Sequence, residues 1–451
     1  MSPLRTSLAA GVARAAGVAA RATGSGGTSL PGKVMLALDP RAIDRLGARL
    51  PQGSAVISAT NGKTTTALMA AAILEGRGER LVHNRAGANM AGGIAATLLS
   101  ERGDRGLFEV DEFWLDGVVE QLHPQALLLA NLFRDQLDRY GELETIAERW
   151  AQVTASGAAQ RLILNADDPT VADLGRDRVD VLYFGVEDDG VALPALQHAS
   201  DATHCRRCGA PYVYDAHYLG HLGRYHCESC GARRPQPTIA AREITLEGID
   251  GASFTLDVAG HTERIRIPLP GLYNVYNALA AAALTTALGA SPQEIVAGLQ
   301  AVRAAFGRAE RVNLAGRDLA ILLIKNPAGA NEVLRTLALE DGEHDVLAIL
   351  NDNIADGRDV SWIWDADFEV LGGRVRSATC AGTRAAEMAL RLKYAGVPED
   401  RIEVVDDLPV ALDRAVAVDG DGPLFVLPTY TAMLTLREEL VRRGAATESF
   451  A

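Results

Sequence analysis

Residues 54–66 read Ser54-Ala55-Val56-Ile57-Ser58-Ala59-Thr60-Asn61-Gly62-Lys63-Thr64-Thr65-Thr66. The apolar start predicts a short strand, the glycine predicts a turn, and the following ALMAAAILEGRG predicts a helix. Backbone N–H groups at such a helix start point towards an anion, and the helix dipole favours negative charge there. We therefore expect a phosphate-binding loop, in which Gly62 allows close approach, Lys63 reaches the terminal phosphates and Thr64 holds Mg²⁺. Ile57 stands where the general pattern has its first glycine.

The sequence on both sides of this loop alternates between strand-like and helix-like segments. Apolar runs predict strands at Leu107–Val110, Ala126–Ala130, Leu162–Leu164, Val181–Phe184, Leu319–Ile324, Asp345–Leu350 and Leu424–Leu427. Helices are predicted at Asn274–Leu288 and Ala328–Leu339, and the alternating pattern of residues 242–269 predicts β-hairpins. Strands that alternate with helices indicate an α/β fold whose mostly parallel sheets are covered on both faces.

The composition excludes several classes of protein. The 451 residues include 44 basic and 58 acidic side chains, a net charge of −14, which argues against a nucleic-acid coat or a basic membrane binder. No run of about 18 apolar residues could span a membrane. The stretch Ser2–Thr23, with small residues and scattered arginines, predicts a packed helix rather than a signal peptide or a membrane-surface helix, so we expect a cytoplasmic protein. Lysine occurs only at 33, 63, 325 and 393, and each deserves inspection, because arginine cannot replace a compact ammonium.

Two cysteine pairs predict a metal site. Cys205 and Cys208 are separated by eighteen residues from Cys227 and Cys230, and a glycine follows each pair. This spacing is typical of a zinc ribbon, in which four thiolates close a tetrahedron and leave no position open for catalysis. A redox dithiol needs only one pair, and a disulfide needs an oxidising compartment for which nothing in the sequence argues. We expect structural Zn²⁺.

The phosphate loop resembles that of the Mur ligase and folylpolyglutamate synthase family, with Ala59 in place of the family's first glycine. Further segments resemble this family in the same order: residues 131–138 (NLFRDQLD), 165–169 (NADDP), 271–278 (GLYNVYNA) and 307–311 (GRAER). The resemblance implies ATP binding by Thr60, Asn61, Gly62, Lys63, Thr64, Thr65, Asn274, Asn277 and Arg308. It also implies Mg²⁺ binding by Thr64 and Glu109, with Glu112 as the alternative.

Two departures from the family concern its amino-acid ligase apparatus. Gln136 occupies the place of a magnesium-binding histidine. The family's carbamylated lysine should fall near Arg149 or Trp150, yet no lysine lies between Lys63 and Lys325. The resemblance therefore implies a retained ATP site beside an altered ligase site.

Residues 350–365, LNDNIADGRDVSWIWD, follow a buried strand and carry several carboxylates at the kind of strand end where α/β proteins place chemistry. Together with the cysteine insert, this stretch resembles the MurT-type subunits of lipid II isoglutaminyl synthases. Residues 29–33 (SLPGK), 83–90 (HNRAGANM) and 427–433 (LPTYTAM) extend the resemblance over nearly the whole chain. The fold that it implies is a Mur ligase-like P-loop central domain with an inserted zinc ribbon and a second, Rossmann-like C-terminal domain. We place the boundaries at 1–45 for an N-terminal helical segment, 46–311 for the central domain, 203–235 for the insert and 312–451 for the C-terminal domain.

This second resemblance implies a function. ATP would phosphorylate the α-carboxylate of D-glutamate in the lipid II stem peptide at the inner membrane surface, and ammonia would then give D-isoglutamine. Asn84, Arg85 and Asn89 would bind the substrate. The ammonia would come from a GatD-type glutamine amidotransferase that forms a heterodimer with this chain. Asp356 would complete the Cys–His pair of that partner, with Asp352 and Asp359 as weaker candidates.

Two other functions remain open at this point. A conventional ligase would join an amino acid to a carboxylate, against which the missing lysine and Gln136 argue. A scaffold would use ATP only to hold a partner, against which Lys63, Thr64 and Glu109 argue. A glutaminase within this chain is disfavoured, because Cys380 lacks a nucleophile-elbow glycine and no histidine follows His344. We expect Cys380 to be a packed thiol.

Overall fold

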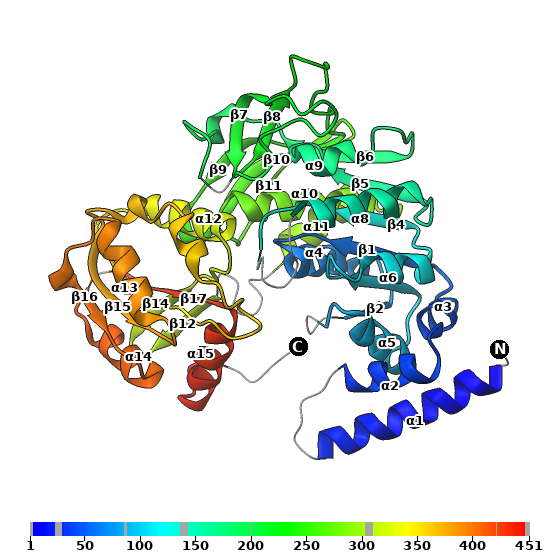
Figure 1. The fold of residues 1–451 in the computed structure, drawn as a ribbon, viewed down its shortest axis with the longest axis horizontal. Coiled ribbons are helices and arrows are strands. Elements are labelled where there is room, and N and C mark those ends of the chain that lie inside the picture. The colour runs from blue at the N-terminus through cyan, green and yellow to red at the C-terminus, as the bar shows by residue number, and fades with distance from the viewer. Residues whose placement is uncertain are drawn as a thin grey trace.

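The computed structural model describes residues 3–22, 29–84, 88–135, 143–198, 200–302, 310–420 and 422–446, and within the first helix the side chains of residues 8–18. The chain forms three parts: a pair of N-terminal helices, a large domain built on a nine-stranded sheet, and a C-terminal domain built on a six-stranded sheet (Figure 1). Among the described residues, we find no helix with the length and apolar character needed to cross a membrane.

The nine-stranded sheet carries the phosphate loop in its middle. Its order is β11-β10-β9-β6-β5-β4-β1-β3-β2. The strands are β1 (Ser54–Ser58), β2 (Leu81–His83), β3 (Arg105–Glu109), β4 (Ala126–Leu129), β5 (Arg161–Asn165), β6 (Val181–Val186), β9 (Ile239–Leu246), β10 (Ala252–Val258) and β11 (His261–Ile267). The pairings from β2 to β9 are parallel, and β9, β10 and β11 pair antiparallel, which confirms both the parallel sheet and the hairpins predicted for residues 242–269.

Helices cover both faces of this sheet because its central strands are apolar on both sides. In β1, Ala55 and Ile57 face one core and Val56 faces the other. The first core is covered by α4 (Lys63–Gly76), α10 (Leu272–Ala287) and α11 (Pro292–Ala301). The second is covered by α3 (Ala42–Gly47), α5 (Ala91–Ser100), α6 (Leu115–Leu122), α8 (Leu143–Ala155) and α9 (Pro169–Asp173). Alternation with a period of two explains why each strand serves two cores.

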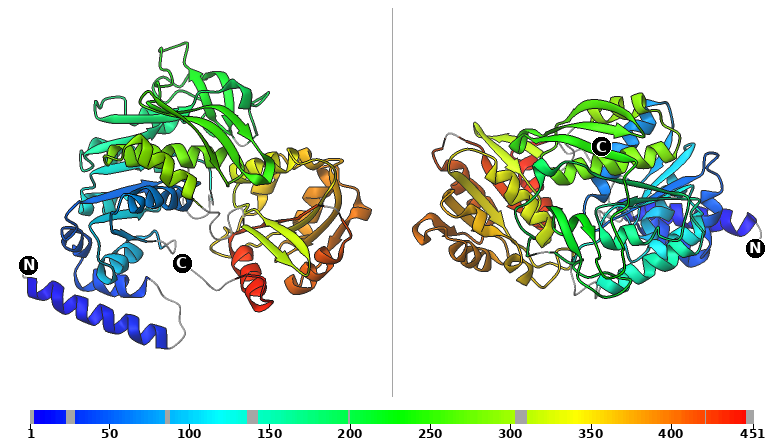
Figure 2. Two further views of the ribbon diagram at one scale, coloured as in Figure 1. Left: turned by 180° about the vertical axis from the view of Figure 1, so that it is seen from behind. Right: turned by 90° about the horizontal axis from the view of Figure 1, so that it is seen from above.

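The N-terminal helices α1 (Pro3–Ala22) and α2 (Leu30–Leu38) extend the second core outwards. Ala9, Ala10 and Ala13 of α1 are buried, which confirms the packed helix expected from the sequence. In both views that show α1 lengthwise, it forms an arm along one edge of the molecule (Figures 1 and 2).

The cysteine insert forms the short hairpin of β7 (Val213–Leu219) and β8 (Leu222–His226), flanked by the two cysteine turns. It leaves the large sheet after β6 and returns to it at β9. The 3₁₀ turns η1 (Asp189–Val191) and η2 (Gly248–Asp250) lie on either side of it in sequence.

The C-terminal domain has a second mostly parallel sheet of order β12-β13-β17-β14-β15-β16. Its strands are β12 (Glu310–Leu314), β13 (Arg317–Ile321), β14 (His344–Ile349), β15 (Val375–Ala381), β16 (Ile402–Val404) and β17 (Leu424–Pro428). One face of the sheet packs on α12 (Pro327–Ala338), α13 (Ala385–Tyr394), η3 (Ser361–Trp364) and η4 (Phe368–Leu371). The other face packs on α14 (Leu408–Ala417) and α15 (Tyr430–Arg442). The short turn η5 (Glu399–Arg401) precedes β16. The predicted second α/β domain is thereby confirmed, and Figure 2 shows it beside the large domain rather than stacked on it.

Candidate active site

The phosphate loop lies between β1 and α4, as the sequence predicts. Gly62 is the N-cap of α4 and has φ +86°, a left-handed conformation that favours glycine. A Cβ atom there would lie 2.0 Å from Oδ1 of Asn277. Both the backbone conformation and this close contact therefore disfavour any residue with a side chain. Asn277 itself accepts a hydrogen bond from Thr66 at 3.2 Å, which fixes α10 against the first turn of α4.

The loop is held from its other side by the segment that follows β4. The backbone N–H of Asn61 donates to Oδ1 of Asn131 at 2.9 Å, and Nδ2 of Asn131 donates to the Asn61 carbonyl at 3.0 Å. The hydroxyl of Thr60 accepts from the Phe133 backbone N–H at 3.1 Å. These contacts tie the loop to the segment that follows β4.

Lys63 is surrounded by carboxylates. Its Nζ donates to Oε2 of Glu112 at 2.8 Å and to the carbonyl of Ala59. Burial alone would lower the pKa of Lys63, but the nearby carboxylates of Glu112, Asp111 and Glu109 outweigh burial and raise it. The side chain is therefore a permanent ammonium in a low-dielectric site.

The carboxylates come from the carboxyl end of β3. Glu109 pairs with Ile57 of β1 across the sheet, which places it beside the phosphate loop. Glu109 and Glu112 are 2% and 7% exposed, and both line the cavity described next. A strand end beside the loop is where open α/β sheets bind ligands. Because Glu112 already pairs with Lys63, Glu109 is the better candidate of these two carboxylates for binding a metal ion, and Asp111 lines the same cavity.

A cavity of about 410 Å³ opens above the loop, between the two α/β domains. Residues 60–65 form part of its wall, and the C-terminal domain contributes Lys325, Glu332 and Tyr430. Nζ of Lys325 donates to the Thr60 carbonyl at 3.2 Å and to Oδ2 of Asp135 at 2.6 Å. The site is thus shared by both domains.

A reciprocal amide pair joins the domains at the same point. Nδ2 of Asn326 donates to Oδ1 of Asn61 at 3.0 Å, and Nδ2 of Asn61 donates back at 3.3 Å. Asn326 is also the N-cap of α12, where its side chain accepts from the Gly329 N–H at 2.9 Å. Neither Lys325 nor Asn326 is among the predicted site residues, although the scarcity of lysine was a signal for the first of them.

The other predicted ligand-binding residues lie at varying distances from the cavity. Asn277 and Asn89 line it. Asn274 is not part of its wall, and its side chain bonds Asn277 at 3.0 Å and the Pro270 carbonyl at 2.7 Å. Asn84 is buried, and its amide exchanges hydrogen bonds with the backbone of Glu109 at 2.8 and 3.0 Å, so it orients that strand end. The predicted residues Arg85 and Arg308, together with Gln136, lie outside the described residues.

The two residues near the expected place of the family's carbamylated lysine do not reach the cavity. Trp150 of α8 is fully buried in the core. The Arg149 guanidinium stacks 4.2 Å above the ring of Phe113 and donates to the Phe113 carbonyl. Neither side chain lines the cavity.

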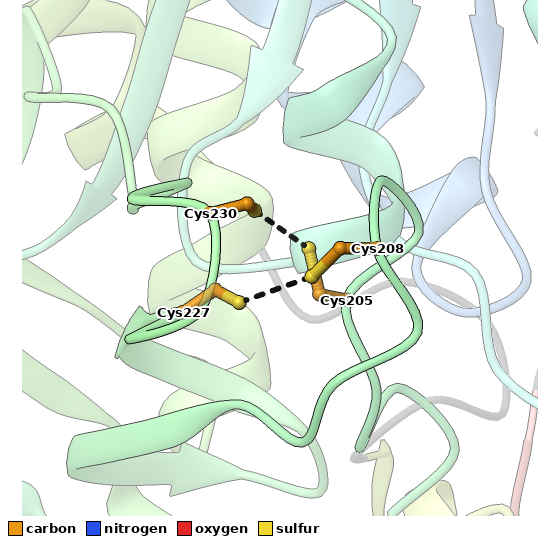
Figure 3. A group of neighbouring side chains, drawn as sticks. All are labelled: Cys205, Cys208, Cys227 and Cys230. Atoms are coloured by element: carbon orange, nitrogen blue, oxygen red, sulfur yellow. Dashed lines mark hydrogen bonds between the residues drawn. The ribbon is translucent and has the colours of Figure 1, made fainter.

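The four predicted zinc ligands converge (Figure 3). Their sulfur atoms all lie within 4.8 Å of one another, with 3.6 Å between Cys205 and Cys230 and 3.5 Å between Cys208 and Cys227. A tetrahedron with Zn–S bonds of about 2.3 Å has edges of about 3.8 Å, so the cluster fits zinc. Gly209 and Gly231, with φ +75° and +73°, close the two turns as expected.

The insert is tied to the large domain through its hairpin tip. His221 is fully buried, stacks near Phe133 with ring centroids 4.6 Å apart, and has Nε2 3.3 Å from Oδ2 of Asp168. Burial alone would lower the pKa of His221, but Asp168 outweighs it and raises the pKa. Leu219 and Leu222, on either side of the tip, line the cavity. The cysteine insert therefore forms part of its wall.

Asp356 lies in the loop after β14, against α15. It is 5% exposed, and its carboxylate accepts from the backbone N–H of Thr431 at 2.7 Å and from the Thr431 hydroxyl at 2.5 Å. Asp352 is instead paired with Arg384 at 2.8 Å, and Asp359 is exposed and accepts from the Ser361 N–H. Of the three candidate aspartates, Asp356 alone is both buried and held by neutral donors.

Cys380 of β15 is fully buried, and burial raises the pKa of its thiol to about 12. The packed, unreactive thiol expected from the sequence is confirmed.

Comparison with known families gives two matches on this chain. The Mur ligase middle domain family matches residues 57–220, and the MurT ligase C-terminal family matches residues 323–433. The structure of a pseudomurein peptide ligase type C from Methanothermus fervidus is similar with a TM-score of 0.67 over 88% of this chain and 80% of that one. Its 22% identity shows the shared Mur ligase fold alone.

Two relatives are more similar in sequence. A protein of Staphylococcus aureus (strain N315) named lipid II isoglutaminyl synthase (glutamine-hydrolyzing) subunit MurT is 33% identical over 435 residues, 96% of this chain and 97% of that protein. The protein of the same name from Streptococcus pneumoniae (strain ATCC BAA-255 / R6) is 32% identical over 92% of this chain and 93% of its own length. Because these alignments run through both domains and the cysteine insert, the chain belongs to the MurT family of ATP-dependent, Mur-type ligase subunits.

Proposed function

We propose that this chain is the synthetase subunit that amidates the α-carboxylate of D-glutamate in the lipid II stem peptide, giving D-isoglutamine. The observation that carries the proposal is the cavity between the two domains, where Lys63 and the carboxylates of β3 meet at a preformed phosphate loop. The glutamine-hydrolysing synthase named among the relatives supplies the substrate class and the source of nitrogen. With lipid II as substrate, the reaction takes place at the cytoplasmic face of the membrane.

The proposed chemistry has two steps. A carboxylate oxygen of the substrate attacks the γ-phosphorus of ATP, the bond to the β-phosphate oxygen breaks, and ADP leaves with that electron pair. Ammonia then attacks the acyl carbon, the bond to the phosphate oxygen breaks, and phosphate and one proton are released with the amide. Lys63 stabilises the charge on the transferring phosphoryl group. Mg²⁺, when bound by Thr64 and Glu109, neutralises phosphate charge in the same place.

Ammonia explains the altered ligase site. A small neutral nucleophile needs no pocket that orients an amino acid, so Arg149 and Trp150 in place of the family's lysine are compatible with the reaction. This favours amidation over a conventional ligase that joins an amino acid to a carboxylate.

The nitrogen source in this proposal is a GatD-type glutaminase bound to the C-terminal domain as a heterodimer. Asp356 would complete the partner's Cys–His pair. A triad aspartate is buried and fixed by hydrogen bonds while it orients an imidazole. Asp356 fits that description through its two bonds from Thr431, whereas Asp352 is committed to Arg384. We also propose the domain boundaries given above, with the catalytic cavity between residues 46–311 and 312–451.

The test is co-expression with a candidate amidotransferase, co-purification, and mass spectrometry of lipid II after incubation with ATP and glutamine. A mass decrease of about 1 Da, from exchange of a hydroxyl for an amino group, supports the proposal. The same product from ammonium salt without the partner assigns the synthetase reaction to this chain.

Two outcomes contradict the proposal. Product formation that depends on an added amino acid, with the mass increase of that residue, indicates a conventional ligase. Stable complex formation without ATP hydrolysis under any substrate indicates a scaffold.

A further inference from the structure

Glu332 is a buried carboxylate of the cavity for which the reaction above has no use. It lies on α12, is 1% exposed, and lines the cavity between the domains. Neither carboxylate oxygen has a well-aligned hydrogen-bond donor among the described residues, although the backbone N–H groups of Leu272 and Tyr273 lie close, and Nη1 of Arg335 is 3.8 Å away.

Such a group needs a ligand to satisfy it. Buried polar atoms nearly always have a hydrogen-bond partner, and an unsatisfied carboxylate carries a large desolvation cost. Burial raises the pKa of Glu332, against the opposing effects of Arg335 and of the backbone N–H groups that begin α10. The missing partner is therefore a hydrogen-bond donor that arrives with whatever fills the cavity.

The position of Glu332 on its helix identifies the part of the ligand that reaches it. Helix α12 begins at Asn326, which contacts Asn61 of the phosphate loop. Glu332 lies six residues further on, about 9 Å along the helix axis. A ligand whose phosphates lie on the loop would therefore meet Glu332 with a part of the molecule that lies away from those phosphates, whereas the reacting carboxylate and ammonia belong at the γ-phosphate.

The wall around Glu332 suits a flat, largely apolar ring. Leu219 and Leu222 of the zinc insert, Val333 of α12 and Tyr273 of α10 line this cavity. Of the two asparagines that the family resemblance assigns to ATP, Asn277 lines the cavity, whereas Asn274 is not part of the wall and its amide is bonded to Asn277 and Pro270. Within this part of the wall, Glu332 is a carboxylate with both oxygens lacking a hydrogen-bond partner among the described residues.

We propose that the Glu332 carboxyl group accepts a hydrogen bond from the 6-amino group of adenine and so selects ATP over nucleotides that lack this donor. A guanine base in the same orientation presents the 6-oxo acceptor to a carboxyl oxygen, which is repulsive. This inference rests on the proposed ATP binding and adds to it the residue that reads the base.

The experiment pairs a change in the protein with a change in the ligand. Binding of ATP and of purine riboside triphosphate, which has hydrogen in place of the 6-amino group, is measured by competition against a fluorescent ATP analogue. The full chain is used as wild type, Glu332→Ala and Glu332→Gln. Wild type should bind ATP about 10- to 100-fold more tightly than the analogue, as expected for a hydrogen bond to a charged group.

Glu332→Ala should reduce this ratio to about one, and Glu332→Gln, whose amide oxygen still accepts, should retain most of it. A merely structural role would weaken both nucleotides equally in Glu332→Ala, and that result overturns the inference. Glu340→Gln is the matched control, because Glu340 lies just beyond the same helix and bonds the Ile249 N–H at 2.7 Å, away from the cavity.

Two further measurements distinguish this inference from binding of the ribose by Glu332 and from failure of the proposed ATP site. In the first arm, the affinities of 2′-deoxy-ATP and 3′-deoxy-ATP are compared with that of ATP. If Glu332→Ala removes the preference for ATP over one of these deoxy analogues, and not the preference over the purine analogue, then Glu332 binds the ribose and the inference is wrong. Lys63→Ala should weaken ATP and the analogue equally. If ATP binding depends on Lys63 but Glu332→Ala still prefers ATP over the purine analogue, the assignment of Glu332 to the base is wrong and the proposed ATP site stands. If the wild type binds neither nucleotide, both the base assignment and the proposed ATP site are wrong.

Discussion

At the scale of single residues, Lys63 is the cation that the proposed phosphoryl transfer requires. Its ammonium is held between the Ala59 carbonyl and Glu112, at the mouth of the phosphate loop. We expect Lys63→Ala to lower ATP-dependent amidation at least 100-fold, the size of effect seen when a preorganised electrostatic donor is removed. Amidation is measured by mass spectrometry of lipid II, and circular dichroism should show an unchanged fold. Lys33→Ala, at an exposed lysine, is the control. Normal product formation at saturating ATP would remove Lys63 from the mechanism.

Asp356 gives a prediction that separates two half-reactions. Asp356→Asn is nearly isosteric, so its contacts with Thr431 and assembly with the glutaminase should survive. Without the negative charge, the partner's imidazolium is not stabilised, and glutamine hydrolysis should fall by a factor on the order of 10⁴. Amidation from added ammonium salt should persist, because the cavity is built from other residues.

The matched control is Asp359→Asn, which changes an exposed carboxylate in the same loop. It should leave both reactions unchanged. Equal loss of ammonia-dependent and glutamine-dependent amidation in Asp356→Asn would show that Asp356 serves the synthetase site instead.

What the sequence reveals at this scale depends on how close the residues lie along the chain. The phosphate loop and the cysteine pairs were predictable, because consecutive residues carry each pattern. Lys325, Asn326 and Glu332 were not, because the packing of two domains brings them to a loop about 265 positions earlier. No local pattern marks such residues; only the rarity of lysine drew attention to one of them.

At the scale of elements, the cysteine insert forms part of the wall of the cavity between the domains. Its hairpin tip places Leu219 and Leu222 in the wall and buries His221 against Asp168. We expect about one zinc ion per chain by elemental analysis, and its loss in Cys205→Ser or Cys230→Ser. Structural zinc contributes on the order of 10 kcal/mol in isolated peptides, so the insert should loosen and ATP affinity should fall with it.

The measurements are metal content, thermal unfolding and nucleotide binding on the same preparations. Cys380→Ser, which changes the cysteine outside the cluster, should retain the metal. Protein purified without chelator and found free of zinc would contradict the assignment of the four thiolates.

Most elements were predictable because their patterns are strong. The strands leading to the phosphate loop and to residues 350–365 are continuous apolar runs, and both appear as buried parallel strands. The sequence could not show that the hairpin of the cysteine insert turns inwards, because its tip, Leu219–Leu222, has the composition of an ordinary buried turn. Its direction is set by His221 and Asp168, which lie 53 positions apart.

At the scale of the whole molecule, the amide pair between Asn61 and Asn326 joins the C-terminal domain to the phosphate loop. Asn326→Ser keeps a good N-cap for α12 but is too short to reach Asn61. We expect it to raise KM for ATP about fivefold, the equivalent of one hydrogen bond, with little change in the unfolding temperature.

Asn326→Ala should raise KM to the same extent and also cost about 0.5–2 kcal/mol of stability, because it removes the helix cap as well. Steady-state kinetics and thermal unfolding of both variants separate the two roles. If Asn326→Ser leaves KM unchanged, the amide pair is a static contact that nucleotide binding does not sense.

The scarcity of lysine has a practical consequence. The side-chain amines number four, of which Lys63 and Lys325 lie in the cavity while Lys33 and Lys393 are exposed elsewhere. Acylating reagents followed by peptide mapping therefore yield a footprint in which Lys325 reports from the site and two exposed lysines serve as internal references, while Lys63, held as an ammonium beside Glu112, should react slowly. Protection of Lys325 relative to the two references would measure nucleotide occupancy in the unmutated protein, including in crude extracts where a fluorescent ligand is of no use.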